Sequence, residues 1–209
     1  MKARTGSVIA VLGGVVLLTA IAALAYPPAV GILGKSPNCL SCHIDNGGWV
    51  DGPDLIIDIV DQQTKTSLKQ PDGSFLLEAE RGQIVTVTTI IGFRKEKGRV
   101  APYRNAWLYV DPKQIDSASL TKFPAGWEVN LPMACRLVGD KSEFYPDADI
   151  TVLPMTLLPG KAAVDGVVTL QVMLTRGEAV KGKAREGMIG NFFQRTLVLK
   201  VMPDGRRSR

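Results

Sequence analysis

The stretch FLLEAERGQIVTVTTIIGF, residues 75–93, decides the fold class of this chain. An apolar run is followed by Arg81-Gly82, which is a turn signal, and then by a second run of β-branched residues. The second run alternates along its length, with Val85, Val87 and Thr89 set against Thr86, Thr88 and Ile90. A period of two residues is typical of a β-strand with one buried face. The stretch therefore predicts a strand, a tight turn and a second strand.

The same signals recur along the chain from Leu55 onward, where no segment has helical periodicity. A turn signal, QPDGS, stands at residues 70–74, and further proline and glycine turns separate the later strands. Additional strands are expected over residues 55–60, 105–112, 148–155, 166–175 and 194–202. Short strands at such spacing are typical of a sandwich. The sequence therefore predicts a mainly β fold, an immunoglobulin-like β-sandwich.

The composition is that of a folded protein and gives no sign of a nucleic-acid partner. Of 209 residues, 45% are hydrophobic and 22% charged, which excludes a disordered chain. The net charge of +5 is mildly basic, but no Lys/Arg run inside the domain is dense enough for nucleic-acid binding.

The N-terminus predicts export. Lys2 and Arg4 precede an uncharged apolar run over residues 8–26, long enough to span about 30 Å of hydrocarbon. A retained anchor is favoured, although Ala23-Leu24-Ala25 also fits a signal peptidase site. Both interpretations place the folded domain outside the cytoplasmic membrane, facing the periplasm or the cell exterior. The expected organisation is an anchor or signal peptide at 1–28, a haem-binding segment at 29–54, the β-sandwich at 55–204 and a basic tail at 205–209.

The motif Cys39-Leu40-Ser41-Cys42-His43 contains two of the three cysteines and the only histidine. C-x-x-C-H is the attachment pattern of c-type haem: two thiols add to the haem vinyl groups and the histidine becomes the proximal iron ligand. A zinc site lacks a second ligand pair, and a thioredoxin-like pair would follow a strand rather than a Pro/Gly linker. The motif therefore predicts one covalent haem c held by Cys39, Cys42 and His43.

The segment CLSCHIDNGGWVDGPDL resembles the start of a class I cytochrome c, in which the motif is followed by a Gly-rich loop and often by Gly-Pro-x-Leu. In that family the proline carbonyl accepts a hydrogen bond from the proximal histidine. The resemblance implies this role for Pro53 and covers about seventeen residues. The strands that follow depart from the family fold. Cytochrome f, a largely β cytochrome whose sixth ligand is an N-terminal tyrosine amine, is a looser parallel. It implies the α-amine of Tyr26 as a ligand if the chain is cleaved.

The sixth iron ligand is the open question, because the chain has no second histidine. Met133 is the first candidate, since it stands in a long segment, residues 111–147, that is expected to be irregular. Further candidates are Met188, Met155 and Cys135. A partner protein could also donate the ligand, or the sixth position could be vacant.

The function expected from these features is that of a membrane-anchored monohaem cytochrome rather than an enzyme. It would transfer electrons outside the cytoplasmic membrane to redox partner proteins or within a larger membrane redox complex. The alternatives are a haem-based sensor or ligand-binding protein with an open sixth site, and a β-sandwich assembly or adhesion subunit without haem.

Overall fold

The computed structural model describes residues 38–41, 43–116, 122–177 and 186–203. Within these ranges the secondary structure consists of strands and two one-turn 3-10 helices. The elements are η2 (Cys39–Ser41), β1 (Ile44–Asp45), β2 (Leu55–Asp61), β3 (Phe75–Glu80), β4 (Val85–Arg94), β5 (Arg104–Val110), β6 (Trp127–Val129), β7 (Met133–Leu137), β8 (Ala148–Pro159), β9 (Gly166–Thr175), η3 (Glu186–Met188) and β10 (Ile189–Met202).

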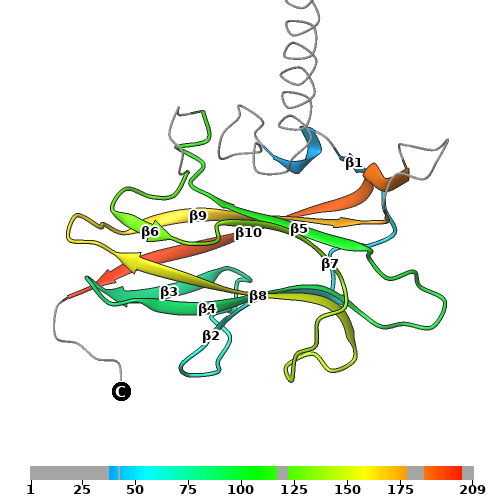
Figure 1. Ribbon diagram of the computed structural model, residues 1–209, viewed down its shortest axis with the longest axis horizontal. Helices are drawn as coiled ribbons and strands as arrows, with labels where there is room; N and C mark the ends of the chain where they lie inside the picture. The colour runs from blue at the N-terminus through cyan, green and yellow to red at the C-terminus, as the bar shows by residue number, and fades with distance from the viewer. Residues whose placement is uncertain (1–37, 42, 117–121, 178–185, 204–209) are drawn as a thin grey trace, which may run out of the picture.

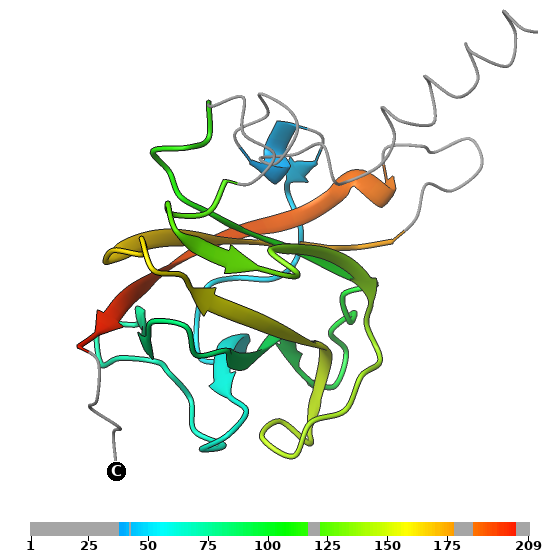
Figure 2. The ribbon, with the colours of Figure 1, turned by 60° about the vertical axis from the view of Figure 1, so that its left-hand side comes forward.

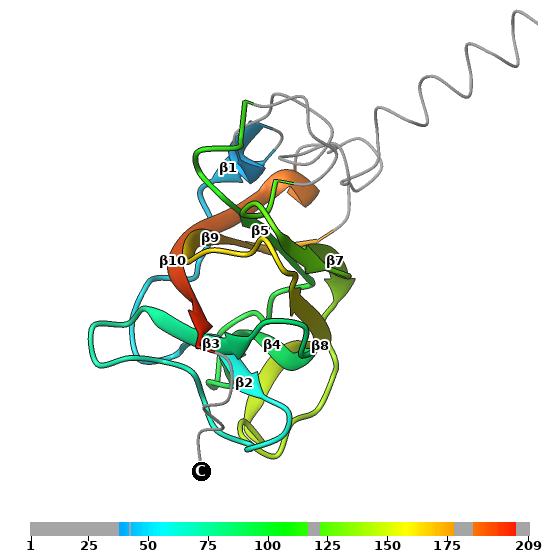
Figure 3. The same cartoon turned by 90° about the vertical axis from the view of Figure 1, so that its left-hand side faces the viewer.

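The strands form two packed sheets (Figures 1 and 3), so the predicted β-sandwich is confirmed. The first sheet, sheet A, has six strands in the order β1-β10-β9-β5-β7, with β3 paired to β10. The second, sheet B, has four in the order β2-β4-β8-β6. Numbered along the chain, β2, β4 and β8 take the places of strands A, B and E of an immunoglobulin sandwich, and β5, β9 and β10 those of C, F and G.

The main core lies between the sheets. It is built from the inward-facing residues of both, among them the fully buried Ile59, Leu157 and Leu197. Two polar contacts cross this core: Thr89 bonds the Tyr109 hydroxyl at 2.9 Å, and the Asn105 amide nitrogen donates to the Ile91 carbonyl at 2.7 Å. Burial of the hydroxyl raises the pKa of Tyr109, so it stays protonated.

Strand β10 positions the candidate site, because both halves of one of its edges carry other strands. Its first residues pair in parallel with β1, with Ile44 opposite Ile189, and its last six pair in parallel with β3. Its other edge pairs antiparallel with β9. The residues just after His43 are thereby joined to sheet A.

The predicted membrane-spanning run, residues 8–26, lies outside the described residues. No helix within the described ranges is long and apolar enough to cross a membrane.

Candidate haem-attachment site

The described residues of the motif form a turn that Asn38 caps. The Asn38 side-chain oxygen accepts from the Leu40 N–H at 2.9 Å, which is the bond of a helix N-cap. The His43 N–H donates to the Cys39 carbonyl at 2.9 Å, so the chain makes one full turn between these two residues. Positions four apart on such a turn lie on one face. Cys39 and His43 are both half-buried, and Cys42 lies outside the described residues.

The imidazole of His43 is oriented by the main chain of η3. Its Nδ1 lies 3.3 Å from the Met188 carbonyl oxygen. A carbonyl can only accept, so Nδ1 carries the proton in this contact. Burial lowers the pKa of His43, although the bond to the Met188 carbonyl offsets part of this effect. The ring is therefore neutral at pH 7, and its Nε2 lone pair is available to a metal.

The segment that follows His43 is fixed to β10 by a dense set of hydrogen bonds. The N–H groups of Asn46 and Gly47 both donate to the Gly190 carbonyl, at 2.9 and 2.8 Å. The Asp45 carboxylate accepts from the Asn191 side-chain amide at 3.2 Å. A Cβ on Gly47 would stand 2.8 Å from the Gly190 carbonyl carbon, so only glycine permits this approach. The position of His43 is thus set by the β-sandwich.

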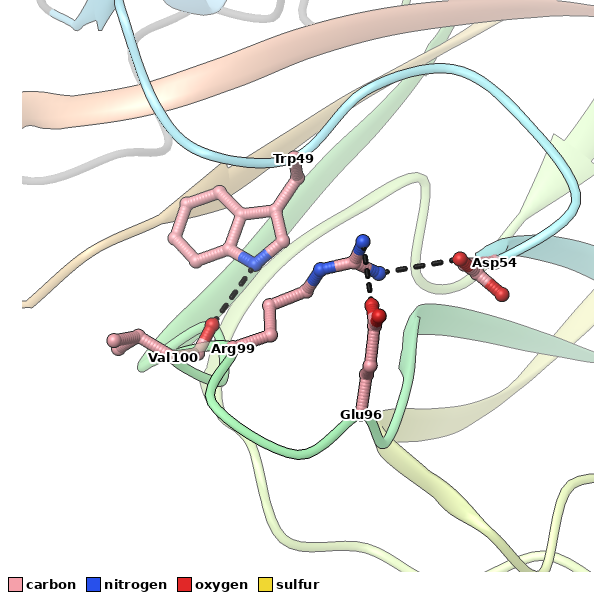
Figure 4. A network of polar contacts seen from close by, with 5 residues as sticks. All are labelled: Trp49, Asp54, Glu96, Arg99 and Val100. Atoms are coloured by element: carbon pink, nitrogen blue, oxygen red, sulfur yellow. Dashed lines mark hydrogen bonds and ion pairs between the residues drawn. The ribbon is translucent and has the colours of Figure 1, made fainter.

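Trp49 completes the attachment of this segment (Figure 4). It is 3% exposed and belongs to the main core, and its indole Nε1–H donates to the Val100 carbonyl at 3.2 Å. Beside it, the Arg99 guanidinium pairs with Asp54 at 3.2 Å and with Glu96 at 2.6 Å. Trp49 therefore ties the segment to the loop between β4 and β5, whose conformation the Arg99 pairs support.

The carbonyl that faces His43 Nδ1 belongs to Met188. The resemblance to class I cytochromes implies instead that the Pro53 carbonyl accepts the hydrogen bond from this histidine. Pro53 is exposed and stands in the turn before β2, a strand of the other sheet. The chain has crossed from sheet A toward sheet B by this point, and the carbonyl within hydrogen-bond distance of Nδ1 in this structure is that of Met188.

Met133 does not stand in irregular structure as expected. It begins β7, where it pairs with Leu108 of β5. Strand β7 lies at the opposite edge of sheet A from β1, which follows His43. Four strand spacings of about 4.8 Å place these edges roughly 19 Å apart. Met133 is therefore not adjacent to His43.

The other candidates for the sixth iron ligand lie in different parts of the chain. Met155 is 1% exposed and packs in the core between the sheets. Cys135 lies on β7 like Met133, and burial raises the pKa of its thiol, an effect that Arg104 only partly offsets. Tyr26 lies outside the described residues.

Met188 lies beside His43 and presents its main-chain carbonyl oxygen to Nδ1 at 3.3 Å. As a sixth ligand it stays a prediction.

The described residues contain no group of three or more His, Cys, Asp or Glu side chains that could hold a metal ion by themselves. A haem differs from such a site, because the porphyrin supplies four ligands and the protein only one or two. His43, neutral and oriented through Nδ1, meets that smaller requirement.

Comparisons with known proteins assign no family to the chain. A scan of protein-family models finds no match, and neither does a search of curated proteins. Among solved structures, the PapD-like domain 7 of human CEP192 is 12% identical, covers 77% of this chain and 97% of its own, and has a TM-score of 0.34. The Salmonella enterica SafA pilin in complex with the SafB chaperone is 9% identical, with coverage of 79% and 61% and a TM-score of 0.35. AvmM, described as catalysing macrocyclization in alchivemycin A biosynthesis, is 8% identical, with coverage of 79% and 98% and a TM-score of 0.35. At these values the likenesses assign no function.

Sequence reasoning missed the groups that hold the motif in place. The Met188 carbonyl is a main-chain group 145 residues from His43, and no side-chain pattern marks it. Asn191 and Trp49 follow no periodic pattern either. The one available signal is the glycine at 190, which lies inside an otherwise strand-forming run.

Proposed function

We propose that this chain is a monohaem c-type cytochrome that carries electrons outside the cytoplasmic membrane, anchored by its N-terminal apolar run. The observation that carries the proposal is the Cys39–His43 turn, in which the only histidine is neutral and oriented through Nδ1 by a main-chain carbonyl. This is the arrangement that suits an imidazole for ligation through Nε2.

In this proposal the haem supplies the reversible one-electron chemistry of its iron, and the chain supplies attachment and orientation. Cys39 and Cys42 would form the two thioether bonds. His43 would be the proximal ligand, with its ring plane set by the Met188 carbonyl. The residue types and the turn fit this use.

In this proposal the β-sandwich holds the haem-attachment segment in a fixed position. Asn46, Gly47 and Trp49 join the attachment segment to β10 and to the core within six residues of His43. A cofactor held there would move with the β-domain as one body. This supports a role in which the sandwich presents the haem to redox partner proteins or to a membrane redox complex.

The experiment is expression of the full chain in a bacterium that matures c-type haem, followed by haem staining after denaturing electrophoresis. A stained band at the mass of the chain is expected. The double variant Cys39→Ser/Cys42→Ser should accumulate without stain, since both thioether bonds are lost. Unstained wild-type protein would remove the proposal and favour the alternative of a β-sandwich assembly subunit without haem.

A further inference from the structure

Strand β7 ends sheet A on one side, and one of its edges carries no other strand. Within the described part of the chain β7 pairs only with β5, and it is the last strand in the order β1-β10-β9-β5-β7. Figures 2 and 3 show the chain turning from the end of β7 toward sheet B, where β8 begins. The main-chain N–H and C=O groups along such a free edge are a template for pairing with another strand.

Two hydrogen bonds show which residues of β7 face the free edge. The Tyr109 N–H donates to the Pro132 carbonyl at 2.7 Å, and the Val138 N–H donates to the Tyr103 carbonyl at 3.0 Å. Pro132 and Val138 stand on either side of β7, so the even-numbered residues turn their main-chain groups toward β5. Because this direction alternates along a strand, the odd-numbered residues of β7 turn theirs to the free edge. These residues are Met133, Cys135 and Leu137.

The side chains of β7 leave this edge open to a partner. Residues 133–137 contain neither proline nor lysine, the residues that commonly block edge strands. The charged side chain of Arg136 is turned back onto its own chain, where it donates to the Val152 carbonyl at 3.3 Å and pairs with Asp140 at 3.6 Å. Leu137 is apolar and yet 51% exposed.

The sequence of β7 is complementary to itself about Cys135. In an antiparallel pair of two β7 strands centred on this residue, Met133 of each copy stands opposite Leu137 of the other, and Ala134 stands opposite Arg136. The Met133–Leu137 pairs are apolar. The Ala134–Arg136 pairs keep the two arginines apart, whereas a register centred on Arg136 would set two like charges directly opposite each other. The register centred on Cys135 is also the one that pairs the whole strand.

We infer that two copies of this chain associate through β7, with the two strands antiparallel about a two-fold axis at Cys135. The residues that face the free edge in one copy then stand opposite those of the other copy, so each such pair exchanges two main-chain hydrogen bonds. A contact between identical surfaces closes at two copies, whereas pairing of β7 with a different strand edge would allow further growth. The inference does not depend on haem attachment, because it uses no residue of the haem-attachment segment.

The size of the contact sets its expected strength. Strand β7 has five residues, so the paired strands bury less than the about 1,200 Å² at which stable protein interfaces begin. We therefore expect a weak dimer whose fraction rises with protein concentration. The competing account is that the shortness of β7 is itself a protection against pairing and that the chain stays a monomer.

The first test is sedimentation velocity of the full chain in mild detergent, over concentrations up to about 0.5 mM because the contact is small. The protein carries Cys39→Ser/Cys42→Ser, so Cys135 is its only cysteine. Leu137→Pro removes an N–H that faces the free edge and leaves the bonds to β5, which is a placement that edge strands tolerate. Leu137→Val is the matched control, because it also shortens the side chain but keeps the N–H. The inference predicts a dimer that Leu137→Pro weakens about tenfold, with one bond lost in each copy, and that Leu137→Val weakens much less.

The second test is disulfide cross-linking, which reports the register. Two residues directly opposite in such a pair have Cα atoms about 5.5 Å apart, within the range that a disulfide spans. With copper phenanthroline as the oxidant, two Cys135 thiols form one S–S bond, release two protons and pass two electrons to two Cu²⁺ ions. The inference predicts a cross-linked dimer on non-reducing electrophoresis and much less of it in Leu137→Pro.

A chain that stays monomeric at every concentration would overturn the inference. So would a dimer that Leu137→Pro leaves intact, because association would then use another surface. A dimer that gives no Cys135 cross-link also overturns it, since the two Cys135 residues are inferred to stand opposite each other. If Leu137→Pro does not fold, the cross-linking of the Cys39→Ser/Cys42→Ser protein decides: the Cys135 dimer supports the inference and its absence overturns it.

Discussion

Replacing Trp49 by phenylalanine should loosen the haem-attachment segment, whereas the same change at Trp127 should not. The two tryptophans form a matched pair. Both are core residues, with 3% and 4% of their surface exposed. Each donates its indole Nε1–H to a valine carbonyl, Trp49 to Val100 at 3.2 Å and Trp127 to Val164 at 2.9 Å. Trp49 lies six residues from His43, while Trp127 stands on β6 of the other sheet.

The expected loss of global stability is similar for both variants. Each loses one hydrogen bond with a net contribution of about 0.5–1.5 kcal/mol. Because Val100 and Val164 are mostly exposed, water can replace the lost donor, and the penalty for an unpaired carbonyl stays small. The smaller ring leaves a cavity that adds about 1–2 kcal/mol. Together these effects lower the free energy of unfolding by about 1.5–3.5 kcal/mol in each variant, as measured by urea denaturation.

The discriminating assay is native-state amide hydrogen exchange, which does not depend on haem. The amides of Asn46 and Gly47 donate to the Gly190 carbonyl, so they are protected only while the segment is docked on β10. In Trp49→Phe these two amides should exchange through a local opening well below the global free energy. In Trp127→Phe their protection should fall only as far as global stability does.

Equal protection of these amides in the two variants would refute the reasoning. It would mean that the hydrogen bonds to β10 hold the segment without Trp49. The pairing of β1 with β10 would then be enough to hold the haem-attachment segment, and substitutions in the core would not alter the properties of the haem.

Three further outcomes follow from the described contacts. In haem-free Cys39→Ser/Cys42→Ser protein, an NMR titration should give His43 a pKa below 6.5. Because the unfolded chain binds this proton at higher pH than the folded chain does, the free energy of unfolding is at its full value above about pH 6.5 and declines as the pH falls. A His43 titration midpoint above 6.5 would contradict this. Asp58→Ala removes a buried carboxylate that accepts a hydrogen bond from the Tyr145 hydroxyl at 2.7 Å, and it should lower the free energy of unfolding by about 2–4 kcal/mol. In the double variant with Tyr145→Phe, the total loss should be smaller than the sum of the two single losses. Gly190→Ala places a Cβ against the Leu174 carbonyl oxygen and Met173 Cε, so thermal unfolding should show a destabilised domain, and an unchanged Tm would contradict this close packing.

The strands of the sandwich could be predicted because each carries its own local pattern. Alternation over 85–90 and the apolar run over 55–60 both mark strands that the structure contains as β4 and β2. The three shortest strands, β1, β6 and β7, were missed. They span two to five residues, too few to establish a period, and they exist because β10, β8 and β5 offer free edges for pairing.

The ligand set could be predicted only in part, for a physical reason. Cys39, Cys42 and His43 are contiguous, so the chemistry of the motif can be recognised in the sequence. The carbonyl that faces His43 Nδ1 belongs to Met188, 145 residues away, and no local pattern marks a main-chain group that meets the motif only after folding.

The most direct test of the central claim is tandem mass spectrometry of proteolytic fragments from the matured full chain. The account predicts one fragment, containing residues 39–43, that carries the added mass of a single haem on its two cysteines. It also predicts that this mass is absent from the Cys39→Ser/Cys42→Ser variant. An unmodified 39–43 fragment from cells that load haem onto other c-type cytochromes would contradict the account.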